Sequence, residues 1–277
     1  MATDVLTARP MLRNVFLKTV RDQRRALTWW SIGLFGTVLM YGAVYPSIRE
    51  NAQALNEYMD SFPEVFREAF LGESGDFTSP AGYLNTELFG FFGPLLLLLY
   101  AIGAGARAIA GEEERRTLDI LLATPVSRSR AVVEKVSAMV FGVVLLCAVL
   151  WGSVAVLGPP FELTPNLVNL AAATVSLGLL ALVFGSIALA IGCSTGRRSL
   201  AIGLSAGIAA ATYLFDILAP SLDAIAWLQK ISPFYYYGEA VPMVNGLDPF
   251  HASVLVAIAA VAFAYALFSF ERRDVAA

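Results

Sequence analysis

Six long apolar runs dominate this sequence and restrict what it can fold into. A helix that crosses the roughly 30 Å hydrocarbon core of a bilayer needs about 20 predominantly apolar residues. The six runs lie at about 29–45, 88–106, 136–157, 170–192, 200–219 and 252–270. Of the 277 residues, 57% are hydrophobic and only 15% are charged, whereas soluble domains carry about a quarter charged residues. We therefore predict an all-α polytopic membrane protein with six transmembrane helices in a single domain, residues 1–277.

The distribution of Lys and Arg predicts the orientation of these helices, because cytoplasmic loops carry the excess. Sixteen of the 19 lie before the first run, in the loop 107–135, between the fourth and fifth runs, or after the sixth. The exceptions are Arg49, Arg67 and Lys230. We expect a multi-pass protein of the cytoplasmic (plasma) membrane with both termini in the cytoplasm. The loop 46–87, with eight acidic residues, is then external, where its charge either attracts cationic substrates or simply reflects the positive-inside bias.

The segment before the first run is amphipathic. Over residues 9–26, apolar side chains such as Phe16 recur at helical spacing, whereas Arg13, Lys18 and Arg21 fall on other faces. This pattern predicts a helix that lies on the cytoplasmic surface. Such a helix serves either as a membrane anchor or as a docking surface for a partner protein.

The longest charged interruption, GEEERRTLDILLATPVSRSR, separates the second and third runs at residues 111–130. Leu118, Leu121 and Leu122 share one side of a short predicted helix, and Pro125 ends it. A charged rim around an apolar core is typical of a surface that contacts another protein. A solvated helix at the membrane interface would show the same pattern.

This sequence lacks the residues that an ion-coupled transporter or an ATP-driven pump would need. An ion-coupled transporter would place paired ionisable residues inside the spans, but only Asp216, near the outer end of the fifth run, comes close. An ATP-driven pump needs a GxxxxGK[ST] phosphate loop, and the nearest stretch, GCSTGRRS at 192–199, lacks its spacing and its lysine. We expect this chain to bind no nucleotide, metal or other cofactor. We also expect no nucleic-acid partner, because no basic face is combined with a soluble fold.

An intramembrane hydrolase is an alternative from a different class. GEEERR is similar to the Glu-Glu-x-x-x-Arg motif of CAAX-type membrane proteases, but the Arg position falls on Thr117 or Leu118. The histidines that such an enzyme adds on later helices are also missing, since His251 is the only histidine. Cys147 and Cys193 are predicted to be reduced packing residues, and Gly203 and Gly207 are predicted to allow close helix packing.

Residues 111–138 resemble the loop between the second and third spans of ABC-2 type transporter permeases. The family pattern is roughly G-E-x-E-x-G-T-L-[ED]-x-L-L-A-x-P-V-S-R, followed by a lysine. The matching residues are Gly111, Glu112, Glu114, Thr117, Leu118, Leu121, Leu122, Ala123, Pro125, Val126, Ser127, Arg128 and Lys135. Arg116 departs from the pattern, because the family usually has Gly there to ease the turn into the helix.

The resemblance implies an ABC-2 (type V) permease architecture with an N-terminal interface helix. It implies that the loop forms a coupling helix seated in a cleft of a separate ATP-binding subunit, which holds ATP and Mg²⁺. The expected contacts are Glu112, Glu113, Glu114, Arg115, Arg116, Thr117, Leu118, Leu121, Leu122 and Pro125, with Arg13, Phe16, Lys18 and Arg21 on the interface helix. In this interpretation the leucines seat the coupling helix and the charges of 112–116 orient it.

The resemblance also implies a second permease copy, in a homodimer or a paired heterodimer, and export rather than import. A membrane-embedded assembly factor without a transport role remains a further alternative, beside the intramembrane hydrolase.

Overall fold

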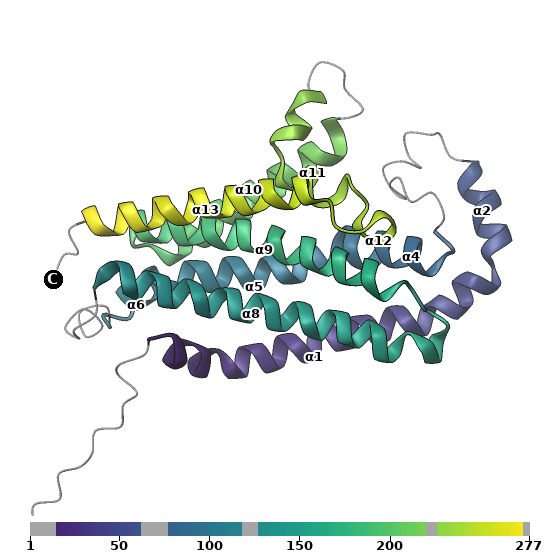
Figure 1. Ribbon diagram of the computed structural model, residues 1–277, viewed down its shortest axis with the longest axis horizontal. Helices are drawn as coiled ribbons and strands as arrows, with labels where there is room; N and C mark the ends of the chain where they lie inside the picture. Colours follow the sequence, from purple (N-terminus) through teal and green to yellow (C-terminus); the bar gives the residue numbers. More distant parts are fainter. Residues whose placement is uncertain (1–14, 62–76, 118–126, 220–225, 274–277) are drawn as a thin grey trace, which may run out of the picture.

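The computed structural model describes residues 15–61, 77–117, 127–219 and 226–273, and every regular element in these ranges is a helix. Six of the helices are long and apolar enough to cross a membrane (Figure 1). They are α1 (Val15–Glu50), the joined segments α4 (Pro80–Tyr83), η3 (Leu84–Phe92) and α5 (Gly93–Ala108), then α8 (Arg128–Leu157), α9 (Leu167–Thr195), α10 (Arg198–Leu218) and α13 (Pro249–Arg272). The predicted fold class, an all-helical protein with six candidate spans, is confirmed.

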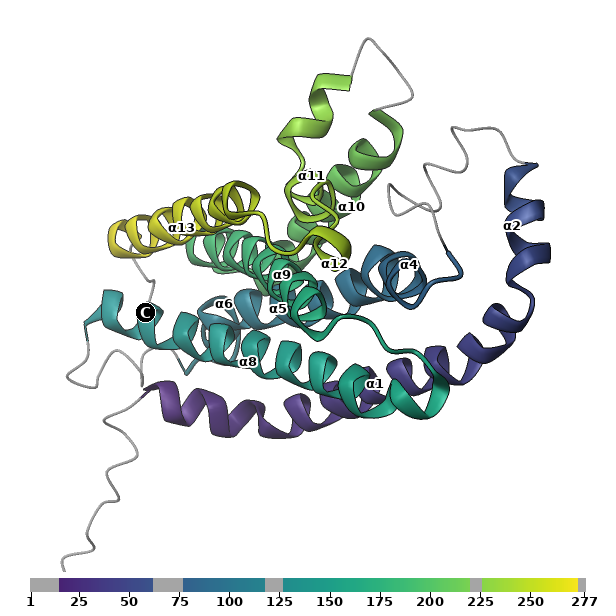
Figure 2. The ribbon, with the colours of Figure 1, turned by 45° about the vertical axis from the view of Figure 1, so that its right-hand side comes forward.

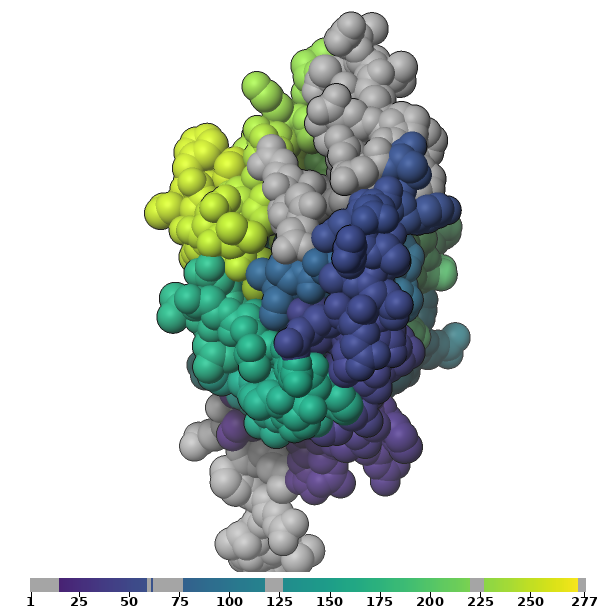
Figure 3. Space-filling model, turned by 90° about the vertical axis from the view of Figure 1, so that its right-hand side faces the viewer, coloured from purple at the N-terminus to yellow at the C-terminus, as the bar shows by residue number. Residues whose placement is uncertain are grey.

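Short helices connect the long ones. They are α2 (Ala52–Asp60), α6 (Ala110–Glu114), η4 (Pro159–Phe161), η6 (Ala226–Ile231), α11 (Pro233–Gly238) and α12 (Pro242–Asn245). We call the end of the bundle where α1 begins and α13 ends the α6 end, and the opposite end the α4 end (Figure 1). At the α4 end, where α2 stands beyond α1 (Figure 3), Arg49 forms an exposed ion pair with Glu162 after η4.

Local sequence signals explain where several helices begin and end. The Ser79 hydroxyl caps the composite helix by accepting from the Gly82 amide at 3.1 Å, with Pro80 in the first turn, as the sequence predicts. Ser127 caps α8 in the same way, and α8 stops before Gly158, Pro159 and Pro160. The helices therefore start and stop at capping residues and prolines rather than at the limits of the apolar runs.

The helix α1 is continuous from Val15 to Glu50. Residues 15–26 of the predicted interface segment therefore form its first turns and not a separate element, while residues 9–14 lie outside the described residues. Helix propagation explains this continuity, because adding a residue to an existing helix costs far less than nucleating a new one. Ser61, Pro63 and the phenylalanines at 62, 66 and 70 predict a short capped helix, and residues 62–76 lie outside the described residues.

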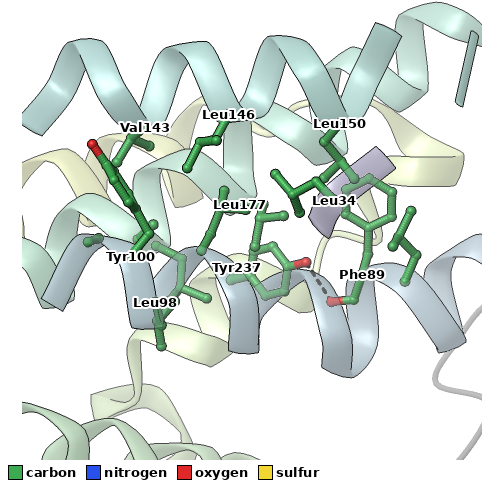
Figure 4. Close-up of a cluster of buried hydrophobic side chains, with 14 of the residues drawn as sticks. Leu34, Phe89, Leu98, Tyr100, Val143, Leu146, Leu150, Leu177 and Tyr237 are labelled. Carbon is green, nitrogen blue, oxygen red and sulfur yellow. Dashed lines mark hydrogen bonds between the residues drawn. The ribbon is translucent and has the colours of Figure 1, made fainter. Parts of the chain in front are cut away.

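A π-helical segment, η3, interrupts the second span just before Pro94. The Gly93 amide bonds to the carbonyl of Leu88, so the Phe89 carbonyl would have to accept from residue 94, and proline has no N–H to donate. The Tyr237 hydroxyl of α11 replaces the missing donor, because it donates a hydrogen bond to the Phe89 carbonyl at 2.6 Å (Figure 4). A buried carbonyl that the helix cannot satisfy thus receives a donor from elsewhere in the fold.

The most enclosed of the six long helices is α9, which lies between α13 and α5 (Figure 2). It contacts α5 and α13 most extensively, and α10 and α8 less so. Fully buried side chains such as Leu34, Leu146, Leu177 and Phe184 join α1, α8 and α9 into the main apolar cluster (Figure 4). Because lipid is as apolar as these side chains, close packing rather than exclusion from water holds such helices together.

The closest approach of α5 and α9 depends on two glycines. A Cβ atom added at Gly105 would lie 2.1 Å from the Gly185 carbonyl oxygen. By contrast, a Cβ added at Gly203 or Gly207 would meet no heavy atom of the described residues within 4 Å. The close packing predicted at Gly203 and Gly207 is therefore not made within the described part of this chain.

We expect Gly105→Ala to destabilise the fold by about 1–3 kcal/mol, because α5 and α9 must move apart to admit the methyl group. Gly152→Ala on α8 is the matched control, since a Cβ there meets nothing within 4 Å. The measurement is the midpoint of thermal unfolding in detergent. The control should match the wild type or exceed it, and equal midpoints for the two variants would contradict the packing argument.

Candidate functional site

An apolar platform closes the α6 end of the bundle. It is formed by the end of α5, the start of α8, the second half of α9 and the end of α13. Its buried members are Ala108, Ile109, Val132, Leu189, Ala190, Cys193, Ala266 and Phe270. The short helix α6, which leads into the charged loop, continues directly from this platform.

Three consecutive glutamates tie α6 to three different long helices. The Glu112 carboxylate forms an ion pair with Lys135 of α8, and the Glu113 carboxylate forms one with Arg273, which follows α13. The Glu114 carboxylate accepts from the Arg198 amide at 3.1 Å, which satisfies an amide in the first turn of α10. The loop therefore starts from a segment that is bonded to α8, α13 and α10 at once.

Glu112 lies in a strongly positive setting. Burial alone would raise the pKa of Glu112, but hydrogen bonds from Lys135 and Thr117 and the charges of Lys135 and Lys18 outweigh burial and lower this pKa below its ordinary value. The Lys135 side chain is only 7% exposed, so its charge depends on Glu112 for a partner. A carboxylate held ionised in this way suits a structural ion pair and not a general base.

Arg273 bonds to both flanks of the loop. Its guanidinium donates to the Glu113 carboxylate and, through Nη1, to the Cys193 carbonyl at 2.8 Å. Its own carbonyl accepts from Arg128 Nη1 at 2.8 Å, and the Arg128 guanidinium lies 5.8 Å from the Phe270 ring centroid. In the sequence analysis Arg273 is only one of the charges expected in the cytoplasm. No local pattern predicts its contacts with Glu113, Cys193 and Arg128.

The start of α1 is held by the residue next to Lys135. The Phe16 amide donates to Glu134 Oε2 at 3.1 Å, and the Phe16 ring stands edge-on to Phe141 with centroids 6.1 Å apart. Glu134 is also paired with Arg130 at 2.9 Å. Neighbouring residues of α8 thus bind both α1 and α6.

A family model described as ABC-2 family transporter protein matches residues 13–275 of the chain. The chain belongs to this family. With six membrane-spanning candidates, it is a multi-pass membrane protein and a permease component of a transporter. Family membership implies association with an ABC ATP-binding subunit. A search of curated proteins found no match.

The residues predicted to contact the ATP-binding subunit fall into three groups in this permease. Glu112, Glu113, Glu114, Thr117 and Phe16 make intramolecular contacts, and Thr117 bonds to Glu112 through both its amide and its hydroxyl. Arg115 and Arg116 are exposed beyond α6, and Lys18 and Arg21 are exposed on α1. Leu118, Leu121, Leu122, Pro125 and Arg13 lie outside the described residues. The predicted contacts with the subunit therefore stay predictions.

The structure also shows the two segments that prompt the phosphate-loop and hydrolase interpretations. GCSTGRRS, the weak candidate for a phosphate loop, forms the end of α9, a turn and the start of α10, with Gly196 as the left-handed C-cap at φ 67°. Glu112 and Glu113, which prompt the hydrolase alternative, are both ion-paired, and the family that the chain matches is a family of transporter components.

Loss of the Glu112 charge should destabilise the permease in a pH-dependent way. Because the folded-state pKa of Glu112 is lowered, its stabilising effect is present above the ordinary value of 4.5 and disappears as the pH falls through the lowered value. We expect Glu112→Gln to lower the midpoint of thermal unfolding at pH 7 by about 2–4 °C for each kcal/mol lost. The two proteins should converge in acid. Glu50→Gln, an exposed change at the α4 end, is the control, and a difference that persists in acid would refute the ion-pair explanation.

The departure from the family pattern at Arg116 can also be tested. Arg116 has φ 55°, in the left-handed region, which costs an L-residue about 1 kcal/mol and glycine much less. We expect Arg116→Gly to keep the turn, whose amides at 116 and 117 bond back to Glu113 and Glu112. Arg116→Val should break it, because a β-branched residue rarely adopts positive φ. Hydrogen exchange of these two amides distinguishes the variants, and equal exchange in both would contradict the assignment.

Proposed function

We propose that this permease exports a substrate across the cytoplasmic membrane and that ATP hydrolysis on a separate ABC ATP-binding subunit drives it. The observation that carries the proposal is the family loop between α6 and α8, whose start is bonded to α8, α10 and α13. A push that reaches α6 would be passed to three spans through these bonds. ATP and Mg²⁺ would be bound by the partner and not by this chain.

The charge distribution supports a cytoplasmic position for the α6 end. The described Lys and Arg residues gather there, at the start of α1, around α6, at the start of α8 and α10, and after α13. Arg49 and Lys230 lie at or beyond the other ends of these spans. The excess of positive charge marks the cytoplasmic side of a membrane protein, so we infer that both termini are cytoplasmic.

The proposed mechanism is mechanical transmission. When ATP closes the two ATP-binding subunits, the loop moves, and α6 passes the movement to α8, α10 and α13. The start of α1 follows, because Glu134 of α8 holds the Phe16 amide. Helices about the first, second and fifth spans then rearrange and open a path between two permease copies, in a homodimer or a paired heterodimer. The open faces of Gly203 and Gly207 on α10 support the second copy, since small residues let another helix approach closely.

The first test is purification of the tagged permease in detergent, with identification of its partners and an ATPase assay. We expect an ATP-binding subunit to co-purify with the wild type and to be lost from the double variant Leu121→Asp, Leu122→Asp, because buried charge would prevent the leucines from seating in the partner. Membrane levels of the double variant should stay unchanged.

The matched control is Gln53→Asp, Asn56→Asp on α2, which adds the same charge at exposed positions of the α4 end. It should retain the partner and its ATPase activity. A permease that purifies alone would overturn the proposal, and recovery of another protein without any ATP-binding subunit would favour a membrane-embedded assembly factor.

A further inference from the structure

We propose that Arg273 is the positioning residue of the coupling loop: its side chain holds the start of the loop at Glu113, and its backbone carbonyl holds the end of the loop at Arg128. This inference rests on the proposed function for its role in transport. The closure of the loop itself is a property of the permease alone and can be tested alone.

The start of the loop is held by the guanidinium of Arg273, which bonds two different acceptors. One arm of the Arg273 guanidinium bonds both oxygens of the Glu113 carboxylate, and the other arm bonds the Cys193 carbonyl at 2.8 Å. The side chains of Arg273 and Glu113 are 19% and 30% exposed, so water screens their ion pair only in part. A planar guanidinium serves two acceptors in fixed directions, whereas a lysine is a single point of charge.

The end of the loop is held by Arg128, which follows the cap of α8. Arg128 Nη1 donates to the Arg273 carbonyl at 2.8 Å and lies 3.5 Å from the Phe270 carbonyl. Phe270 lies in the last turn of α13 and Arg273 is its C-cap, at the end of a helix where carbonyls lack backbone donors and positive charge is favoured. The hydroxyl of Ser129 adds a bond to the Glu271 carboxylate.

These contacts join the two flanks of the loop through one residue. Bringing the two ends of a loop together costs conformational entropy. Here that cost is already met in the free permease, because Arg273 holds both ends. A loop closed in advance binds a partner with a smaller entropic cost. Because Arg273 also bonds α9 at Cys193, movement of the loop would displace the end of α13 and the end of α9 together.

Hydrogen exchange of the purified permease tests the closure. The reporters are the amides of Arg116 and Thr117, which bond back to Glu113 and Glu112. We expect Arg273→Ala to raise exchange at these amides about tenfold and Arg273→Lys to give an intermediate rise. Arg272→Ala is the matched control, because its guanidinium stacks on the Phe268 ring at 4.1 Å and should leave exchange unchanged.

A double-mutant cycle separates a shared latch from two independent contacts. The hydrogen bonds of Arg128 in the described part of the chain go to α13 and not to Glu113. Arg128→Ala should nevertheless raise exchange at 116 and 117, because it releases the backbone of Arg273, and should add little when Arg273 is already Ala. Additive effects, or wild-type exchange in Arg273→Ala, would overturn the inference. If Arg273→Ala does not fold, Arg273→Lys enters the same cycle.

The partner gives a second measurement, with the ATP-binding subunit that co-purifies with the wild type as the probe. Arg273→Ala should raise the dissociation constant for this subunit about tenfold, and Arg272→Ala should not change it. An unchanged dissociation constant in Arg273→Ala would refute a positioning role. If the wild type recovers no such subunit, the proposed function fails while the exchange result still decides whether Arg273 closes the loop.

Discussion

The structure depends on one constraint, which is that a polypeptide in hydrocarbon must satisfy its own backbone hydrogen bonds. Long helices meet this constraint, and the six long helices follow from it. A place where a span breaks its regular bonding shows how strict the constraint is. Pro94 and the π-helical segment before it leave the Phe89 carbonyl without a backbone donor, and the Tyr237 hydroxyl replaces that donor.

The same chain uses two kinds of packing at different depths. Within the bundle, Gly105 and Gly185 allow α5 and α9 to touch backbone to backbone, and apolar side chains fill the remaining space. At the α6 end, ion pairs take over, because Glu112 and Glu113 are each paired with a cation, Lys135 and Arg273. The ionic connections therefore lie at the α6 end, and the apolar connections lie within the bundle around α9.

Much of this fold follows from short-range patterns, as the confirmed predictions show. The six apolar runs predict the six long helices, and the local chemistry of Ser79, Pro80 and Gly158 to Pro160 accounts for particular helix ends. The family loop is recognised from residues near one another, so a single sequence suffices to find it. The continuity of α1 could not be predicted, because an amphipathic pattern next to an apolar run does not show whether one helix or two will form. The π-helical segment could not be predicted, because the donor that satisfies its Phe89 carbonyl is the Tyr237 hydroxyl, far along the chain.

The sequence by itself determined the membrane class, the number of spans, the clustering of charge at alternate loops and the loop that identifies the family. These properties depend on composition and on neighbours within a few residues. Only the tertiary structure decided what the triple glutamate does, because Lys135, Arg198 and Arg273 come from three helices that are distant in sequence. A charge alone does not specify its partner; helix packing does, by bringing one cation to each carboxylate or, for Glu114, one backbone amide.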